Sequence, residues 1–204
     1  MVGYIQESTG GDFKPTPEGQ HVMVCSRVID LGTQRSEFNG EVKHSRKVLI
    51  VWELPNERTD DGKPLIHSEK FTWSFHEKAN LRKTLEAWRG RKFKDEDFSG
   101  PPNGFHIKNV IGVPCYGQVV HDQGNNGKTY ANLSSLMAFP GKRDEWPKVE
   151  GEQLFFDLDN YDETVFGKLS EYWQGVIKLS PEWGDLQGGT RKQERELVDD
   201  EIPF

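Results

Sequence analysis

LIHSEKFTWSFHEKANLRKTLEAWRG, residues 65–90, is the stretch in which the hydrophobic period of the chain changes from two to about 3.6 residues. Its first part alternates aromatic with polar side chains, which predicts a β-strand over residues 65–75. The alternating aromatic residues are Phe71, Trp73 and Phe75. Because they share one face of that strand, all three face either a core or a ligand.

A helix follows this strand. Ser74 and Glu77 have the spacing of a capping box, in which a hydroxyl and a carboxylate satisfy free backbone N–H groups. Apolar residues then recur at helical spacing, and Gly90 ends the predicted helix. These apolar residues are Leu81, Leu85 and Trp88. The segment therefore predicts a strand followed by a helix.

Four further strands are predicted, two on each side of this segment. Residues 21–31 and 43–54 are rich in Val, Ile and Leu, and residues 115–122 and 129–139 are separated by the Asn-Gly signal of a hairpin. Five strands with one helix between the third and the fourth is the element order of the OB fold. We therefore predict a mainly β protein, a five-stranded Greek-key barrel of a kind that often binds oligonucleotides.

The chain of 204 residues has a net charge of −7 that is unevenly distributed. Residues 1–94 carry 16 Lys and Arg against 13 Asp and Glu, whereas residues 95–204 carry 10 against 20. This asymmetry is typical of a nucleic-acid-binding part joined to an acidic tail, although drift in surface charge also produces it. The only cysteines are Cys25 and Cys115, and no apolar run is long enough to span a membrane. These features predict a cytoplasmic protein with reduced thiols and no membrane association.

Three regions are expected. Residues 1–18 are rich in Gly, Thr and Pro and predict a flexible arm. Residues 19–180 are expected to form the barrel with a C-terminal helical extension over about 162–177 that packs on it or binds a partner. Residues 181–204 have too little apolar surface to offset the entropy of ordering, so a disordered acidic tail is predicted.

The last six residues are suited to binding a partner protein. They place three carboxylates before an apolar Ile-Pro-Phe end: Asp199, Asp200, Glu201, Ile202, Pro203 and Phe204. The Phe204 ring can enter an apolar pocket while the carboxylates meet Arg or Lys at its rim. This end resembles the tip of bacterial single-stranded DNA-binding proteins, with Glu201 in place of an Asp. That resemblance implies recruitment of replication, recombination and repair proteins.

The body of the chain resembles phage-encoded OB-fold proteins of the same function. The resemblance lies in residues 27–34, 46–54 and 76–79 and extends over most of residues 20–140. It implies a protein that binds single-stranded DNA without strong sequence preference, in a bacterial cell or a phage-infected host.

A strand-binding groove needs cations for phosphates and flat side chains for bases. On the predicted strands 2 and 3 and the last hairpin, the candidates are Arg27, Lys43, Arg46, Lys47, Trp52, Lys70, Trp73, Lys128 and Tyr130. Aromatic residues at a period of two more often face a core, so burial remains the competing interpretation for Trp52 and Trp73. If the face of Trp73 is the core, Tyr130 becomes the stacking candidate.

A second basic cluster spans the predicted helix and its exit: Arg82, Lys83, Arg89, Arg91, Lys92 and Lys94. It is a solvated helix face, a phosphate track or a dock for the acidic tail.

No enzyme, metal or cofactor is predicted. His76 and Glu77 begin like a zinc-protease motif, but Asn80 stands where the second metal-binding His belongs. Two other functions stay open: an adaptor that uses the tip without binding DNA, and a metal-dependent nuclease built on Asp157 and Asp159. Whether the chain forms a homo-oligomer is also left open.

Overall fold

The computed structural model describes residues 15–38, 40–124 and 127–188, which divide into two compact units. Of the described residues, the larger unit contains 15–29, 48–124 and 127–155. The smaller unit contains 30–38, 40–47 and 156–188. The sequence predicted one domain over residues 19–180. Residues 30–47, which include the end of the first strand and the start of the second, belong to the smaller unit.

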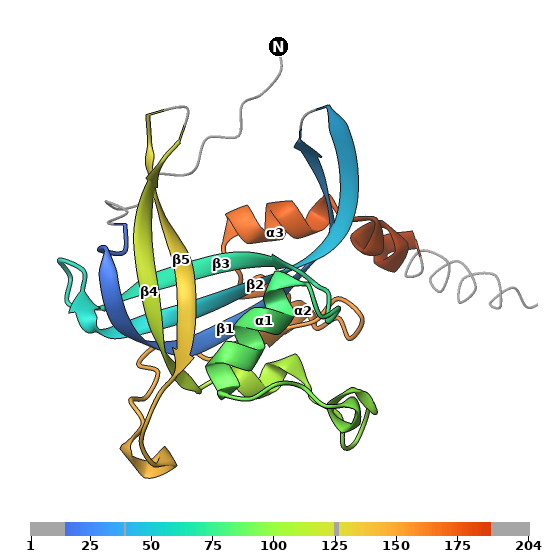
Figure 1. Ribbon diagram of the computed structural model, residues 1–204. Coiled ribbons are helices and arrows are strands. Elements are labelled where there is room, and N and C mark those ends of the chain that lie inside the picture. Colours follow the sequence, from blue (N-terminus) through green and yellow to red (C-terminus); the bar gives the residue numbers. More distant parts are fainter. Residues whose placement is uncertain (1–14, 39, 125–126, 189–204) are drawn as a thin grey trace, which may run out of the picture. The chain divides into compact units, whose positions relative to one another are not determined.

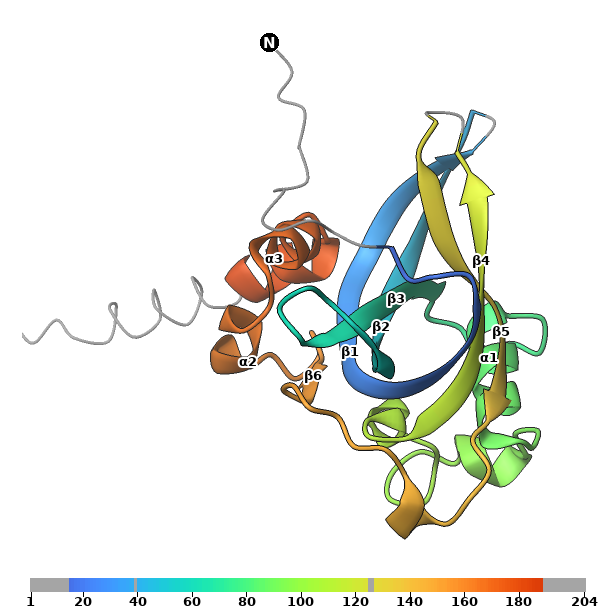
Figure 2. The same ribbon diagram turned by 90° about the vertical axis from the view of Figure 1, so that its left-hand side faces the viewer.

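Six strands form one sheet in the described chain, which confirms the mainly β class (Figure 1). They are β1 (Gly19–Phe38), β2 (Glu41–Arg58), β3 (Pro64–Thr72), β4 (Pro114–Gln123), β5 (Thr129–Ala138) and β6 (Leu154–Phe156). Their order across the sheet is β3-β2-β1-β4-β5, and β6 pairs with β1. Figure 1 and Figure 2 both show β4 and β5 side by side, in agreement with their antiparallel pairing.

The helices are short. They are α1 (Asn80–Arg89), α2 (Glu163–Gly167) and α3 (Glu171–Lys178), together with the 3₁₀ turns Asp95–Phe98, Ile107–Val110 and Arg143–Glu145. The predicted α1 is confirmed, and it ends at Gly90 in the left-handed conformation that glycine adopts readily. The predicted capping box is wrong, because the N-cap is Ala79, which makes no side-chain cap. Instead, the Ser74 hydroxyl accepts a hydrogen bond from the N–H of His76.

The core of the larger unit lies between the inward faces of its strands and α1. Trp52 of β2 is fully buried, with its ring centroid 5.6 Å from that of Trp88 on α1. The Trp88 indole N–H donates to the carbonyl oxygen of Pro114 at 3.1 Å. Helix α1 contacts both β3 and β5. Burial of such rings provides much of the hydrophobic stabilisation of a small β-rich unit.

A side-chain hydrogen bond joins β3 to β5. The Glu69 carboxylate on β3 accepts a hydrogen bond from the backbone N–H of Leu133 on β5 at 2.7 Å. On the same side, Thr16 is buried, with its hydroxyl 3.1 Å from Nδ1 of His67 and its carbonyl oxygen 2.8 Å from Nε2 of His121. The predicted arm over residues 1–18 is therefore wrong for residues 15–18, and residues 1–14 lie outside the described chain.

The smaller unit has its own core of aromatic side chains. The rings of Phe166 and Trp183 stack with centroids 4.7 Å apart. Gly32 lies so close to this unit's C-terminal part that an added Cβ would come within 2.5 Å of Cβ of Ser180. Glu182 accepts hydrogen bonds from the backbone N–H and the hydroxyl of Thr33, at 2.9 and 2.6 Å. These contacts order a segment that the sequence assigned to the tail.

Residues 181–188 are in fact helical, so the predicted disorder is wrong for them. The rest of the predicted tail lies outside the described chain. The predicted helix over residues 162–177 is present as two helices, α2 and α3, because Ser170 caps a new helix through its hydroxyl. Within the part of the chain that the structure describes, no helix has the length and apolar character needed to cross a membrane.

Candidate nucleic-acid interface

Trp52 cannot stack on a base in this structure. Its side chain has no exposed surface, and it packs in the core with Trp88 and His67. The residues of β2 from Val48 to Leu54 are all buried, so both faces of this strand are covered. A ligand would have to displace core residues to reach Trp52, and the structure therefore removes this residue from the candidate set.

Part of the cover of β2 comes from the chain after β5. The buried Glu53 accepts hydrogen bonds from the backbone N–H groups of Glu150 and Gly151, at 2.8 and 3.1 Å. Arg58 binds the Glu150 carboxylate through both guanidinium nitrogens, at 2.8 and 2.7 Å. This side of β2 is therefore occupied by the protein's own backbone, where the sequence analysis expected a groove.

The predicted contact residues Lys70, on β3, and Trp73, just after β3, lie on opposite sides. The predicted strand over residues 65–75 ends at Thr72 in the structure. Phe71, Trp73 and Phe75 pack against the core of the larger unit, so the face they share is the core face. Lys70 points to the other side and is exposed. Trp73 is half-buried and packs against the core, so the stacking role moves to Tyr130, the candidate expected if the face of Trp73 is the core.

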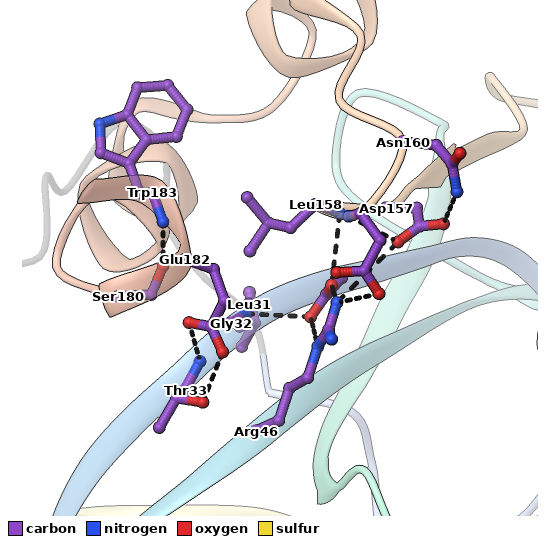
Figure 3. Close-up of polar contacts among 12 residues, drawn as sticks. Leu31, Gly32, Thr33, Arg46, Asp157, Leu158, Asn160, Ser180, Glu182 and Trp183 are labelled. Atoms are coloured by element: carbon purple, nitrogen blue, oxygen red, sulfur yellow. Dashed lines mark hydrogen bonds and ion pairs between the residues drawn. The ribbon is translucent and has the colours of Figure 1, made fainter. Parts of the chain in front are cut away.

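Arg46 of the smaller unit is held in an internal ion pair (Figure 3). Its guanidinium donates to both oxygens of Asp30, a carboxylate with no exposed surface, and Nη2 lies 3.0 Å from Asp159. Asp30 also accepts hydrogen bonds from the N–H groups of Gly32 and Leu158, at 3.0 and 3.3 Å. The hydrogen bond with Asp30 is the main reason that the pKa of Arg46 lies above its usual value.

The same network bears on the nuclease alternative. Asp159 lies beside Arg46, and Asp157 accepts hydrogen bonds from its neighbours Asp159 N–H and Asn160 Nδ2 at 3.1 and 2.8 Å. Among the described residues, no group of three or more His, Cys, Asp or Glu side chains is placed to hold a metal ion. The carboxylates of this region serve a cationic side chain of the protein itself.

The remaining predicted cations differ in exposure. Lys43 is 73% exposed and lies 3.4 Å from the Glu41 carboxylate, and Lys47 is half-buried. Both belong to the smaller unit, whereas the half-buried Arg27 belongs to the larger unit. The structure therefore does not bring the predicted cations together in one unit.

The hairpin between β4 and β5 carries two predicted residues that are both exposed. Lys128 is exposed, and Tyr130 has 46% of its surface exposed. Tyr130 lies opposite Asp122 in the β4–β5 register. A cation and an exposed ring on one hairpin suit the sequence-tolerant binding of a strand.

The basic cluster around α1 is divided. Arg82 donates to Glu86 at 3.0 Å and Arg89 donates to Asp97 at 3.0 Å, so these two guanidinium groups are used internally. These hydrogen bonds are the main reason that the pKa values of Glu86 and Asp97 lie below their usual values. The other four residues are exposed: Lys83, Arg91, Lys92 and Lys94. The partner-binding tip, residues 199–204, lies outside the described chain.

The outward residues of β4 and β5 other than Tyr130 were not among the predicted contact residues. A bulge between Gln118 and Val119 shifts the register, so the inward residues Leu133 and Leu136 are three positions apart. A search for strict alternation cannot follow a strand across such a bulge. The paired register of the two strands is the signal that identifies these residues.

Both cysteines are expected to be unreactive in the native protein. Cys25 and Cys115 have no exposed surface, and burial raises the pKa of each thiol well above its usual value. Because the thiolate is the reactive form, a thiol reagent at about pH 8 should label neither cysteine until the chain unfolds. Ellman's reagent with and without denaturant measures this, and rapid labelling of the native chain would contradict the burial.

In comparisons with known proteins, no model of a protein family matches this chain, and no curated protein matches it significantly.

Proposed function

We propose that the chain is a non-catalytic protein that binds single-stranded DNA through an OB-type barrel in its larger unit and recruits partner proteins through its acidic tip. It would coat unpaired strands during replication or recombination, in the cytoplasm of a bacterial cell or a phage-infected host. Sequence-tolerant binding fits this role, since every base offers a ring face and every nucleotide a phosphate.

The observation that carries this proposal is the strand path. The order β3-β2-β1-β4-β5, with α1 between β3 and β4, becomes a five-stranded ring if β3 and β5 are placed next to each other. The hydrogen bond from Leu133 N–H to Glu69 and the contacts of α1 with both strands support that closure. A partly open Greek-key barrel of five strands is the OB fold, and its known binding surfaces include the loop between strands 4 and 5.

The surface of the larger unit offers suitable chemistry at that loop. Lys128 and Tyr130 are exposed on the β4–β5 hairpin, and Lys70 is exposed on β3. Phosphate neutralisation by such cations would give a salt dependence with a log–log slope of about −0.7 for each contacted phosphate of a single strand.

The acidic tip supports the second half of the proposal. Three carboxylates before Ile202, Pro203 and Phe204 give a short segment with both a charged and an apolar binding element. Pro203 restricts the free conformations of the segment, which lowers the entropy lost on docking.

Titration of a labelled thymidine oligomer of about 30 nucleotides with the full chain tests the proposal and separates it from the adaptor. Fluorescence anisotropy of the label is the better signal, since Trp52 and Trp88 are buried and poorly placed for quenching by bases. Saturable binding that weakens with added salt is expected. An adaptor would leave the anisotropy unchanged at every salt concentration.

Deletion of Phe204 tests the division of roles. We expect the full chain to capture specific proteins from a nuclease-treated bacterial lysate and the chain lacking Phe204 to lose them, because the apolar anchor is gone. The affinity for the thymidine oligomer should stay the same or rise slightly. A large fall in DNA affinity would show that the tip takes part in binding the strand.

A further inference from the structure

The outward face of β4 and β5 is a partly exposed surface of the sheet in the larger unit. The core residues Cys115 and Val119 define the inward side of β4. Gly117 shares that side, since an added Cβ there would come within 2.5 Å of Sδ of Met23. The alternate residues therefore point outward. On β4 they are Tyr116, Gln118, Val120 and Asp122, and on β5 their paired neighbours are Met137, Ser135, Asn132 and Tyr130.

This outward face, which we call the ribbon face, carries apolar and aromatic groups in contact with solvent. Met137 has 55% of its surface exposed and pairs with Tyr116, and Tyr130 is 46% exposed near the other end. The rings of Tyr116 and Phe139 lie with centroids 5.2 Å apart, tilted by 37°. In Figure 1 no other segment of the larger unit crosses in front of β4 and β5. Rings at intervals along an open sheet surface provide stacking positions for bases.

The ribbon face itself carries a single formal charge. In a chain with 33 Asp and Glu against 26 Lys and Arg, its eight paired residues include one carboxylate, Asp122, which accepts a hydrogen bond from Asn132 Nδ2 at 2.7 Å. The rest of its polar groups are two amides and three hydroxyls, which can pair with base edges or phosphates without repelling them.

Cations lie at both ends of the ribbon face. Lys128 precedes Tyr130 at the hairpin end. At the opposite end an added Cβ on Gly90 would be 3.5 Å from Cβ of Ala138, which places the exposed Arg91 and Lys92 beside the end of β5. Lys142 and Arg143 follow β5 at that end and are also exposed, together with the carboxylates of Asp144 and Glu145. At that end the four cations exceed the two carboxylates, so it attracts phosphates. At the hairpin end the charge of Lys128 is balanced by that of Asp122.

We propose that a single DNA strand runs along the ribbon face, from the β4–β5 hairpin to the turn after β5, with bases against Tyr130, Met137 and Tyr116. This inference rests on the proposed function and gives it a location different from the predicted groove on β2 and β3. Strand β5 has 10 residues, a length of about 33 Å. A DNA strand lying along this length would contact a number of nucleotides in the lower part of the range of roughly 4–16 that one OB fold covers.

Two carboxylates placed on the ribbon face provide the test. The double variant Gln118→Glu with Met137→Glu changes side chains that point away from the core, so the fold should persist, which circular dichroism checks. The matched control is Asn103→Glu with Asn109→Glu, which adds the same charge at exposed positions outside the sheet. Binding of a labelled thymidine oligomer by the full-length chain is measured for the wild type and both variants at low and moderate salt.

The ribbon variant is expected to bind at least about tenfold more weakly, and the control variant within about twofold of the wild type. Tyr116→Leu should weaken binding by about tenfold through lost stacking while adding no charge. If the wild type binds and the ribbon variant keeps its affinity, the location is wrong and the proposed function stands. If the wild type itself does not bind, the proposed function fails first.

Sedimentation of the same proteins checks a competing occupant of the ribbon face, a second copy of the chain. The inference expects the ribbon variant and the wild type to have the same oligomeric state. A dimeric wild type, a monomeric ribbon variant and equal DNA affinity would overturn it, since the face would then be a subunit interface.

Discussion

Asp30→Asn is expected to lower the free energy of unfolding by about 3–5 kcal/mol, the cost of breaking a buried ion pair by removing one partner. The Asp30 carboxylate has no exposed surface and accepts hydrogen bonds from Arg46 and from the N–H groups of Gly32 and Leu158. The side-chain amide introduced at position 30 lacks the negative charge. Its N–H groups would also face the donors of the surrounding protein, with which they cannot form hydrogen bonds. Urea unfolding followed by circular dichroism measures the change.

Asp159→Asn is the matched control for this prediction. Asp159 lies 3.0 Å from the same Arg46 nitrogen that binds Asp30, but its side chain is 66% exposed. Solvent screens an exposed pair, so its loss should cost less than about 1 kcal/mol. Equal effects of the two substitutions would show that Asp30 and Arg46 do not form a buried pair in solution.

Trp52→Ala should destabilise the protein by about 3–5 kcal/mol, because removal of a buried ring leaves a cavity as well as removing its transfer free energy. The ring has no exposed surface and lies between Trp88 and His67. A loss of stability within about 1 kcal/mol, combined with weaker binding of a DNA strand, would contradict this and restore Trp52 as a stacking residue.

Two Phe substitutions refine this test. The Trp52 indole N–H has no hydrogen-bond partner among the described residues, whereas that of Trp88 donates to Pro114 at 3.1 Å. Trp52→Phe therefore loses volume alone, while Trp88→Phe also leaves a buried carbonyl without its donor, an additional cost of about 1–3 kcal/mol. The midpoint temperature of thermal unfolding should be lower for Trp88→Phe than for Trp52→Phe. The reverse order would contradict the core geometry.

The strands and α1 were predictable because their hydrophobic periods are strong. Phe71, Trp73 and Phe75 alternate cleanly, and Leu81 and Leu85 follow the helical period that the structure confirms. Such patterns arise from burial of one face and therefore survive in the sequence alone. The C-terminal helix over residues 181–188 was missed because its glycines and charges resemble a disordered segment.

The candidate site was less predictable because exposure is decided by contacts between distant residues. Residues Val48 to Leu54 are all buried. A strand that is covered on both faces shows no alternation of polar and apolar residues, so its sequence does not indicate which way the Trp52 side chain points. Asp30 and Arg46 both read as surface charges, yet the fold pairs them internally. Tyr116 and Met137 become neighbours only through the bulged register of β4 and β5.

A competition titration tests the central claim, binding of single-stranded DNA, most directly. The full-length chain is first bound to a labelled thymidine oligomer of about 30 nucleotides, then challenged with an unlabelled mixed-sequence strand of equal length or with its duplex. We predict that the single strand displaces the label at comparable concentration and that the duplex displaces it poorly. Failure to form the first complex at low salt, or equal displacement by the duplex, would contradict the proposal.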